Sequence, residues 1–184
     1  EMVISEQHFI KTGDLNSKDK YAGIVGLGLH GNEEGFPPEP FQKAFQIGAK
    51  EPGILSLPHA GEIAPSPGKG PESVEKAIDI LDAKRIQHGV LAIENSFLLE
   101  KIARKNICLD VCPSSNIQLS VFPNIASHPL PKLIQAGIPC SIGSDDPLLF
   151  GPSLLEEFEL CREKMSLSDE TLASLAKNSF VFSG

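Results

Sequence analysis

The chain has 184 residues, of which 41% are hydrophobic and 22% charged, so a single domain over residues 1–184 is expected. The formal net charge of −8 comes without a basic run, which argues against nucleic-acid binding. No run of about 18 apolar residues occurs, as a membrane span would need, and residues 1–14 lack the apolar stretch of a secretory signal. The four cysteines lie mostly in apolar segments, as buried thiols do, which predicts a reducing, cytoplasmic setting.

Strand-like and helix-like segments alternate along the chain. Apolar runs predict strands at residues 22–29, 54–59, 85–88, 107–112 and 138–144. Helical patterns lie between them and after them, at residues 41–48, 74–81, 97–103 and 130–137. Ser153 with Glu156 forms a capping-box pattern before another helix, and a last helix is expected from Ser168 to about Lys177.

Polar residues recur once per strand, just after its end. They are spaced by 24 to 33 residues, close to the length of one βα unit, and are His30, His59, His88, Cys112 and Asp145. Repeated βα units predict a parallel sheet, and ligands bind at the carboxyl ends of its strands. We therefore expect these residues to converge on one site.

The number of strands leaves two interpretations of the fold open. A closed (β/α)8 TIM barrel has eight strands and typically about 250 residues, whereas five strands are visible here. The length favours an open five-stranded α/β sheet. The chemistry described next favours a partial (β/α)8 TIM barrel, made of about the last five βα units with the first three strands absent, and this is the fold we predict.

The candidate reactive groups are histidines and carboxylates beside glycine or proline. His59 is a candidate metal ligand, and Glu62 in the same HAGE stretch is a candidate general acid or base. His88 repeats the arrangement one unit later. Asp145 and Asp146 are adjacent carboxylates, and a cation would relieve their repulsion. Each also has an ordinary interpretation, as a loop histidine, a structural hydrogen-bonding residue or a helix cap, but together they suit metal-activated attack of water on an electrophilic carbon.

In order and spacing, five short motifs resemble those of the adenosine/adenine deaminase family, bacterial type, within the zinc amidohydrolase superfamily. The resemblance spans about residues 22–182, and its motifs are LHGNE (29–33), LPHAGE (57–62), RIQHG (85–89), CPSSN (112–116) and SDDP (144–147). It implies zinc-dependent hydrolytic deamination of a 6-aminopurine, adenosine or an adenosine-like nucleoside, with release of ammonia. The implied partner is therefore a small-molecule purine nucleoside or base.

The resemblance also implies roles for individual residues. His59 and Asp145 match metal ligands, and the implied cofactor is one Zn²⁺ per active site. Glu62 matches the catalytic residue that protonates the purine at N1, and His88 the catalytic histidine that orients the attacking hydroxide. Asp146 matches the residue that contacts N7 of the purine, and the backbone N–H of Gly31 matches a contact to N3.

Two of the departures from the family bear directly on function. His30-Gly31-Asn32 stands where many relatives have Ala-Gly-Asp, and the family's H-x-H zinc pair has no counterpart; His8, followed by Phe9, does not supply it. We therefore expect the C-terminal part of a longer enzyme. The alternative is a non-catalytic purine-binding or assembly protein that has lost the metal site.

Several other polar residues are given structural roles. His128 is expected to be a helix-entry residue, and residues 121–129 an apolar loop that could cover a purine site. Glu33 and Glu34 are interpreted as a solvated or substrate-rim pair. Residues 113–116 either line the pocket or form an ordinary turn.

Overall fold

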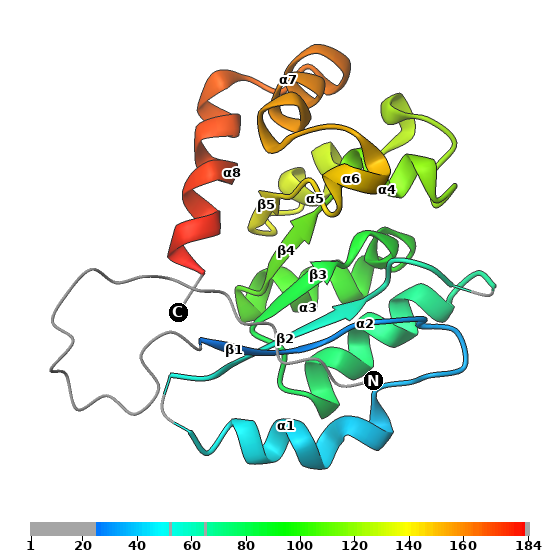
Figure 1. The fold of residues 1–184 in the computed structure, drawn as a ribbon, viewed down its shortest axis with the longest axis vertical. Coiled ribbons are helices and arrows are strands. Elements are labelled where there is room, and N and C mark those ends of the chain that lie inside the picture. Colours follow the sequence, from blue (N-terminus) through cyan, green and yellow to red (C-terminus); the bar gives the residue numbers. More distant parts are fainter. Residues whose placement is uncertain (1–24, 52, 65, 183–184) are drawn as a thin grey trace, which may run out of the picture.

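Five parallel strands form one sheet in chain order (Figure 1). The computed structural model describes residues 25–51, 53–64 and 66–182. The strands are β1 (Gly26–Leu29), β2 (Leu55–Ala60), β3 (Arg85–His88), β4 (Cys108–Val111) and β5 (Cys140–Ile142). Every one lies within or beside a predicted apolar run, although residues 22–24 of the first run lie outside the described residues. Neighbouring strands are parallel throughout, with Leu29 opposite Pro58 and Gln87 opposite Asp110, which confirms the βα arrangement.

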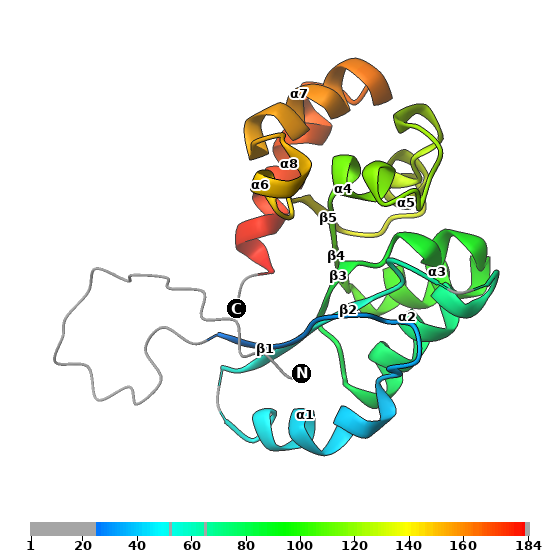
Figure 2. The same ribbon diagram turned by 45° about the vertical axis from the view of Figure 1, so that its right-hand side comes forward.

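Helices connect the strands and follow the last one. They are α1 (Gln42–Gly48), α2 (Lys69–Ile80), α3 (Ser96–Lys105), α4 (Pro113–Gln118), α5 (Leu130–Gln135), α6 (Pro147–Phe150), α7 (Leu154–Met165) and α8 (Asp169–Val181), with 3-10 turns η1 (Glu39–Phe41), η2 (Val90–Glu94) and η3 (Ile125–Ser127). In Figure 2, α1, α2 and α3 lie together on one side of the sheet, while α7 and α8 lie at its β5 end. None of the helices in the described part of the chain is long and apolar enough to cross a bilayer.

The predicted helix signals explain where several helices begin and end. Val74, Ala77 and Ile78 form the buried stripe of α2, as their spacing predicts. Ser153 and Glu156 make both hydrogen bonds of a capping box at the start of α7. The helix after Ser168 is longer than predicted and continues to Val181. Its buried face packs beside β5, and this packing stabilises the last turns of the helix although they contain polar residues.

The main core lies between the sheet and its helices. Ile86 of β3, Leu109 and Val111 of β4, and Ile102 of α3 are completely buried there. All four cysteines are buried and free, which confirms the expectation of buried thiols. Burial of this kind supplies the main driving force for folding, at roughly 25 cal/mol for each Å² of apolar surface.

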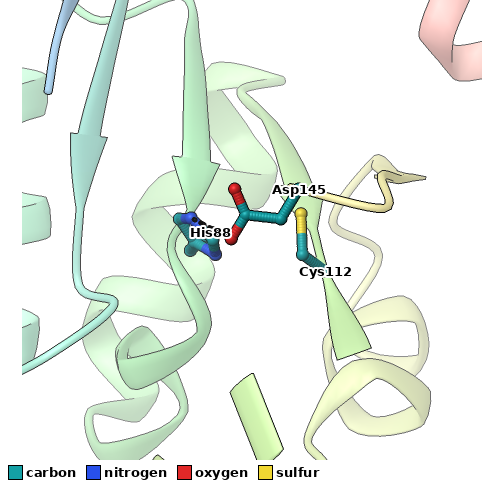
Figure 3. Close-up of side chains that lie close together, drawn as sticks. All are labelled: His88, Cys112 and Asp145. Carbon is teal, nitrogen blue, oxygen red and sulfur yellow. Dashed lines mark ion pairs between the residues drawn. The ribbon is translucent and has the colours of Figure 1, made fainter. Parts of the chain in front are cut away.

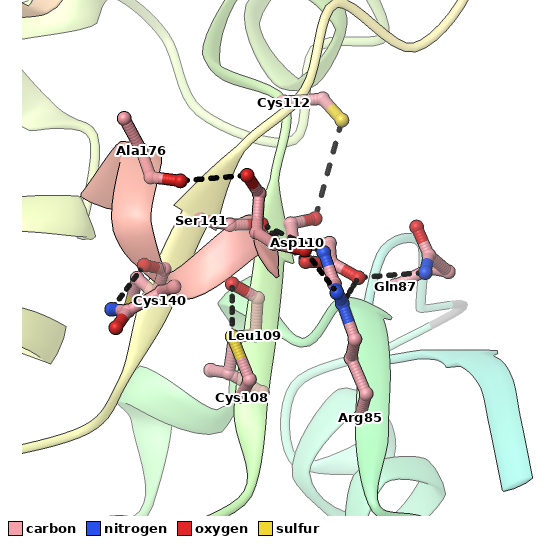
Figure 4. A network of polar contacts seen from close by, with 11 residues as sticks. Arg85, Gln87, Cys108, Leu109, Asp110, Cys112, Cys140, Ser141 and Ala176 are labelled. Atoms are coloured by element: carbon pink, nitrogen blue, oxygen red, sulfur yellow. Dashed lines mark hydrogen bonds and ion pairs between the residues drawn. The ribbon is translucent and has the colours of Figure 1, made fainter. Parts of the chain in front are cut away.

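The opposite face of the sheet is polar, because side chains alternate along each strand. Arg85 and Gln87 of β3 both donate to the Asp110 carboxylate of β4, and the Ser141 hydroxyl of β5 also donates to it (Figure 4). The guanidinium of Arg85 further donates to the backbone carbonyl of Ser179 in α8, at 3.2 Å. This buried polar network joins three strands and the last helix beneath the carboxyl ends of the strands.

Candidate active site

Three histidines stand side by side at the carboxyl ends of the first three strands. The ring centroids of His30 and His59 are 4.3 Å apart, and those of His59 and His88 are 5.2 Å apart. All three line one cavity of about 380 Å³, together with Asp145 from the turn after β5. Residues far apart in the sequence thus meet at one edge of the sheet, as the strand-end argument predicts.

Two of these residues have unusual backbone conformations. His88 has φ = 60° and Asp145 has φ = 56°, in the left-handed region that non-glycine residues rarely adopt. Such a conformation costs on the order of 1–3 kcal/mol, and it persists where surrounding contacts hold it in place. Both residues line the shared cavity.

Glu62 lies beside this cluster, three residues after His59. Its carboxylate oxygen Oε1 is 3.5 Å from His88 Nε2, and its side chain is only 17% exposed. Burial, followed by the negative charges of Asp145 and Glu33, raises the pKa of Glu62 to about 7. His59 and Glu62 also line a second, smaller cavity of about 150 Å³, with Gly31 at its rim. A carboxylic acid with this pKa can give or take a proton near neutral pH.

Glu33 has a role that the sequence did not indicate. Its carboxylate accepts hydrogen bonds from three successive backbone N–H groups, those of Gly61 (2.6 Å), Glu62 (3.1 Å) and Ile63 (3.3 Å). It therefore holds the turn after β2 in the conformation that carries Glu62. Of the two interpretations of Glu33, a solvated residue or a residue at the substrate rim, the structure agrees with the second, because Glu33 lines the smaller cavity and its carboxylate is held by these backbone contacts. Glu34, by contrast, is exposed.

The residues suited to a metal ion also gather here. Burial, with smaller contributions from the positive charges of His88 and His30, lowers the pKa of His59 to about 3, so its imidazole is neutral at pH 7. The buried Nδ1 of His59 has no hydrogen-bond partner. A neutral imidazole and the Asp145 carboxylate are both donors that zinc accepts. His59 and Asp145 therefore fit the expected metal.

A second set of donor atoms lies close together in the same region. Donor atoms of His88, Cys112 and Asp145 all lie within 4.8 Å of one another (Figure 3). Burial and the neighbouring carboxylates, first among them Asp145, raise the pKa of the Cys112 thiol well above its usual value. The thiolate is the metal-binding form of cysteine, and in the metal-free protein this shift keeps Cys112 as the neutral thiol.

The two adjacent aspartates have different surroundings. Asp145 Oδ2 accepts a hydrogen bond of 2.7 Å from the Ser115 hydroxyl and lies 3.9 Å from His88 Nε2. Asp146 is the N-cap of α6, and its Oδ1 accepts from the backbone N–H of Leu148 at 3.0 Å. It is not among the residues that line either cavity, so the structure gathers Asp145 into the cluster but assigns Asp146 a capping contact.

Residues 113–116 and His128 contribute more than their sequence patterns indicated. Residues 113–116 begin α4 and are buried, rather than forming an ordinary turn. The side chain of Asn116 contacts His88 on one side and His128 on the other. His128 is 4% exposed and precedes α5, as expected of a helix-entry residue. Nothing in a single sequence signals contacts between segments so far apart.

A parallel βα sheet with its reactive groups at the carboxyl ends of the strands is the arrangement of enzymes with barrel folds, and histidines and carboxylates there suit metal-assisted hydrolysis. The family model described as adenosine deaminase matches residues 6–183. The chain therefore belongs to the adenosine deaminase family, which confirms the resemblance given by the five motifs.

Individual relatives agree with this assignment. The chain is 42% identical, over 157 residues, to a putative adenosine/adenine deaminase of Streptomyces coelicolor and to an adenine deaminase of Hahella chejuensis. It covers 44% and 45% of the length of these two proteins, and they cover 85% of the chain. The chain thus spans about half the length of the curated relatives it matches.

Solved structures give the same result for the fold. The crystal structure of adenine deaminase from Arthrobacter aurescens matches with a TM-score of 0.80 at 33% identity, covering 88% of this chain and 48% of that one. A zinc-bound amidohydrolase from Burkholderia ambifaria matches with a TM-score of 0.77 at 26% identity, covering 89% and 44%. These matches, with five parallel strands in chain order, confirm the α/β fold as part of a (β/α)8 barrel.

Proposed function

We propose that this chain supplies one part of the active site of an enzyme that removes the 6-amino group of an aminopurine by hydrolysis. The observation that carries the proposal is Glu62, a largely buried carboxyl group with a pKa of about 7 whose Oε1 lies 3.5 Å from His88 Nε2. Membership of the adenosine deaminase family supports the same chemistry.

The proposed roles follow from the surroundings of each group. His59 and Asp145 would hold the zinc ion, together with ligands from elsewhere in the complete protein. When bound, zinc activates a water molecule for attack on an electrophilic carbon. Glu62 in its protonated form donates to N1 of the purine as C6 is attacked, and then takes up the proton lost by the incoming water. It passes this proton to the 6-amino group, the C6–N bond breaks and ammonia leaves, and the proton of the new hydroxyl returns to Glu62 as the 6-oxo group forms. His88 holds the incoming oxygen by a hydrogen bond from Nε2.

Two further residues are proposed as substrate contacts. Gly31 lines the smaller cavity, where its N–H would contact N3 of the purine. Asp146 would contact N7 through Oδ2, since its Oδ1 accepts from the N–H of Leu148. Because the two relatives are a putative adenosine/adenine deaminase and an adenine deaminase, we propose a 6-aminopurine of the adenine and adenosine class as substrate.

The test is ammonia release from adenine and from adenosine by the complete protein, with Glu62→Gln as the variant. Removing a general acid–base group lowers the rate by about 10²- to 10⁴-fold, while zinc content measured by elemental analysis stays at the wild-type level. Glu34→Gln, a change at a nearby exposed carboxylate, is the control and keeps the wild-type rate. Near-normal turnover in Glu62→Gln would refute the role given to this residue.

A further inference from the structure

Behind His88, a line of buried polar side chains leads away from the cavity. Asn116 Nδ2 is 3.3 Å from His88 Nδ1, and His128 Nε2 is 3.2 Å from Asn116 Oδ1. The line ends at the backbone N–H of Leu130, which donates to His128 Nδ1 at 3.2 Å. His88, Asn116 and His128 are only 2%, 0% and 4% exposed, so water cannot substitute freely for any of these partners.

The backbone end of this line fixes the direction of every hydrogen bond in it. A backbone N–H can only donate, so His128 Nδ1 must be an unprotonated acceptor. Burial lowers the pKa of His128 to about 4, and its neutral ring therefore carries its single proton on Nε2. That N–H donates to the Asn116 oxygen, which turns the amide NH₂ toward His88. The amide donates in turn, and His88 Nδ1 accepts.

We propose that Asn116 and His128 are positioning residues that hold His88 in one neutral tautomer, with the ring proton on Nε2, the nitrogen that faces the cavity. Nε2 is the atom that lies 3.5 Å from Glu62 Oε1 and 3.9 Å from Asp145 Oδ2. Phe122 keeps the relay in place, since its ring packs edge-on against His128 with centroids 5.4 Å apart.

The tautomer decides what His88 can do. A nitrogen that carries a proton has no free lone pair, so His88 cannot bind a metal ion through Nε2, whereas it can donate a hydrogen bond to an oxygen in the cavity. The grouping of His88 with Cys112 and Asp145 is thereby excluded as the zinc site, which leaves Asp145 to act with His59. The catalytic consequence rests on the proposed function; the tautomer itself does not.

Nitrogen NMR of the purified protein, labelled with ¹⁵N at histidine, tests the tautomer directly. Ring-nitrogen chemical shifts distinguish a protonated from an unprotonated nitrogen, and loss of signals in His88→Gln assigns the ring. We expect His88 Nε2 to be protonated and Nδ1 unprotonated at neutral pH. A protonated Nδ1, or a mixture of the two tautomers, in the wild-type protein would overturn the proposal.

Variants test whether the relay is the cause. In Asn116→Asp a carboxylate that can only accept faces His88, so a proton should appear on His88 Nδ1. The same change at the exposed residue Asn106 is the control and should leave the His88 signals unchanged. An unprotonated Nδ1 in Asn116→Asp would contradict the relay.

A second pair of variants covers the case in which Asn116→Asp does not fold. His128→Gln keeps an N–H donor near the position of Nε2, whereas His128→Leu removes it and frees the Asn116 amide to turn. We expect His128→Gln to retain the Nε2–H tautomer and His128→Leu to show a population of the Nδ1–H tautomer. Identical spectra of His88 in the two variants would overturn the proposal.

The spectra need neither substrate nor turnover, so they separate this inference from the proposed function. If the expected tautomers are found and no ammonia is released from any 6-aminopurine, the proposed function fails and the relay stands. If ammonia is released but His88 carries its proton on Nδ1, the relay fails and the deaminase assignment stands.

Discussion

The Glu33 carboxylate provides the most direct test of how the turn after β2 is held. In Glu33→Ala, the N–H groups of Gly61, Glu62 and Ile63 lose their common acceptor. Loss of a hydrogen bond to a charged group, with nothing to replace it, costs about 1.5–3 kcal/mol. Because the site is only part-buried, water can replace some of this, and we expect the local opening free energy of the turn to fall by about 2 kcal/mol.

Amide hydrogen exchange measures this free energy at the residues concerned. A fall of about 2 kcal/mol corresponds to roughly 30-fold faster exchange, and it should be confined to residues 61–63. The neighbouring exposed carboxylate offers a matched control, and Glu34→Ala should leave these amides unchanged. Equal exchange rates in the two variants would refute the idea that Glu33 orders the turn. In the complete enzyme, Glu33→Ala should also lower kcat, because the turn positions Glu62.

Three further predictions follow from single contacts. Gly61→Ala should lower the free energy of unfolding by about 3 kcal/mol in urea titrations, because φ at Gly61 is +66° and the new Cβ would lie 2.3 Å from the side chain of Val74. Gly137→Ala is the control: φ there is +78° but the space around it is open, so this change should cost only about 1 kcal/mol. Asp110→Ala leaves the largely buried guanidinium of Arg85 without its carboxylate partner and should cost about 3 kcal/mol, against less than about 0.5 kcal/mol for Glu75→Ala in an exposed ion pair. Folding raises the pKa of Glu62 from 4.5 to about 7, so its stabilising contribution is full below pH 4.5 and is lost as pH rises through 7. Metal-free wild type should therefore lose on the order of 3 kcal/mol relative to Glu62→Gln between about pH 4 and pH 8, and parallel pH profiles of the two proteins would contradict this.

The order of the strands could be predicted from the sequence because each apolar run stops at a glycine- or proline-containing turn that begins with a polar residue. Parallel sheets bring such turns to one edge, so the convergence of His59, His88 and Asp145 follows from topology alone. The same reasoning placed His59 and Glu62 at one cavity, and the structure brings both to the smaller cavity.

The contacts that orient these groups could not be predicted in the same way. Glu33 and Gly61 are 28 residues apart, as are His88 and Asn116. Neither pair has a periodic signal, because a loop contact depends on the path of the backbone and not on alternation or helical spacing. For Asp146, the sequence offered both a functional and a capping interpretation, and only the coordinates show the bond to the N–H of Leu148.

The first turn of α4 shows how orientation is divided between neighbouring units of the fold. The Ser114 N–H donates to Glu157 at 3.3 Å, the Ser115 hydroxyl to Asp145 at 2.7 Å, and the Asn116 amide contacts His88 at 3.3 Å. The strand ends therefore determine which reactive groups meet. The first turn of α4, which follows β4, determines the orientation of His88 at the end of β3 and of Asp145 after β5. Because the groups it holds are Asp145 and His88, a change in this one turn should disturb the carboxylate and the histidine together while leaving the His59 imidazole in place.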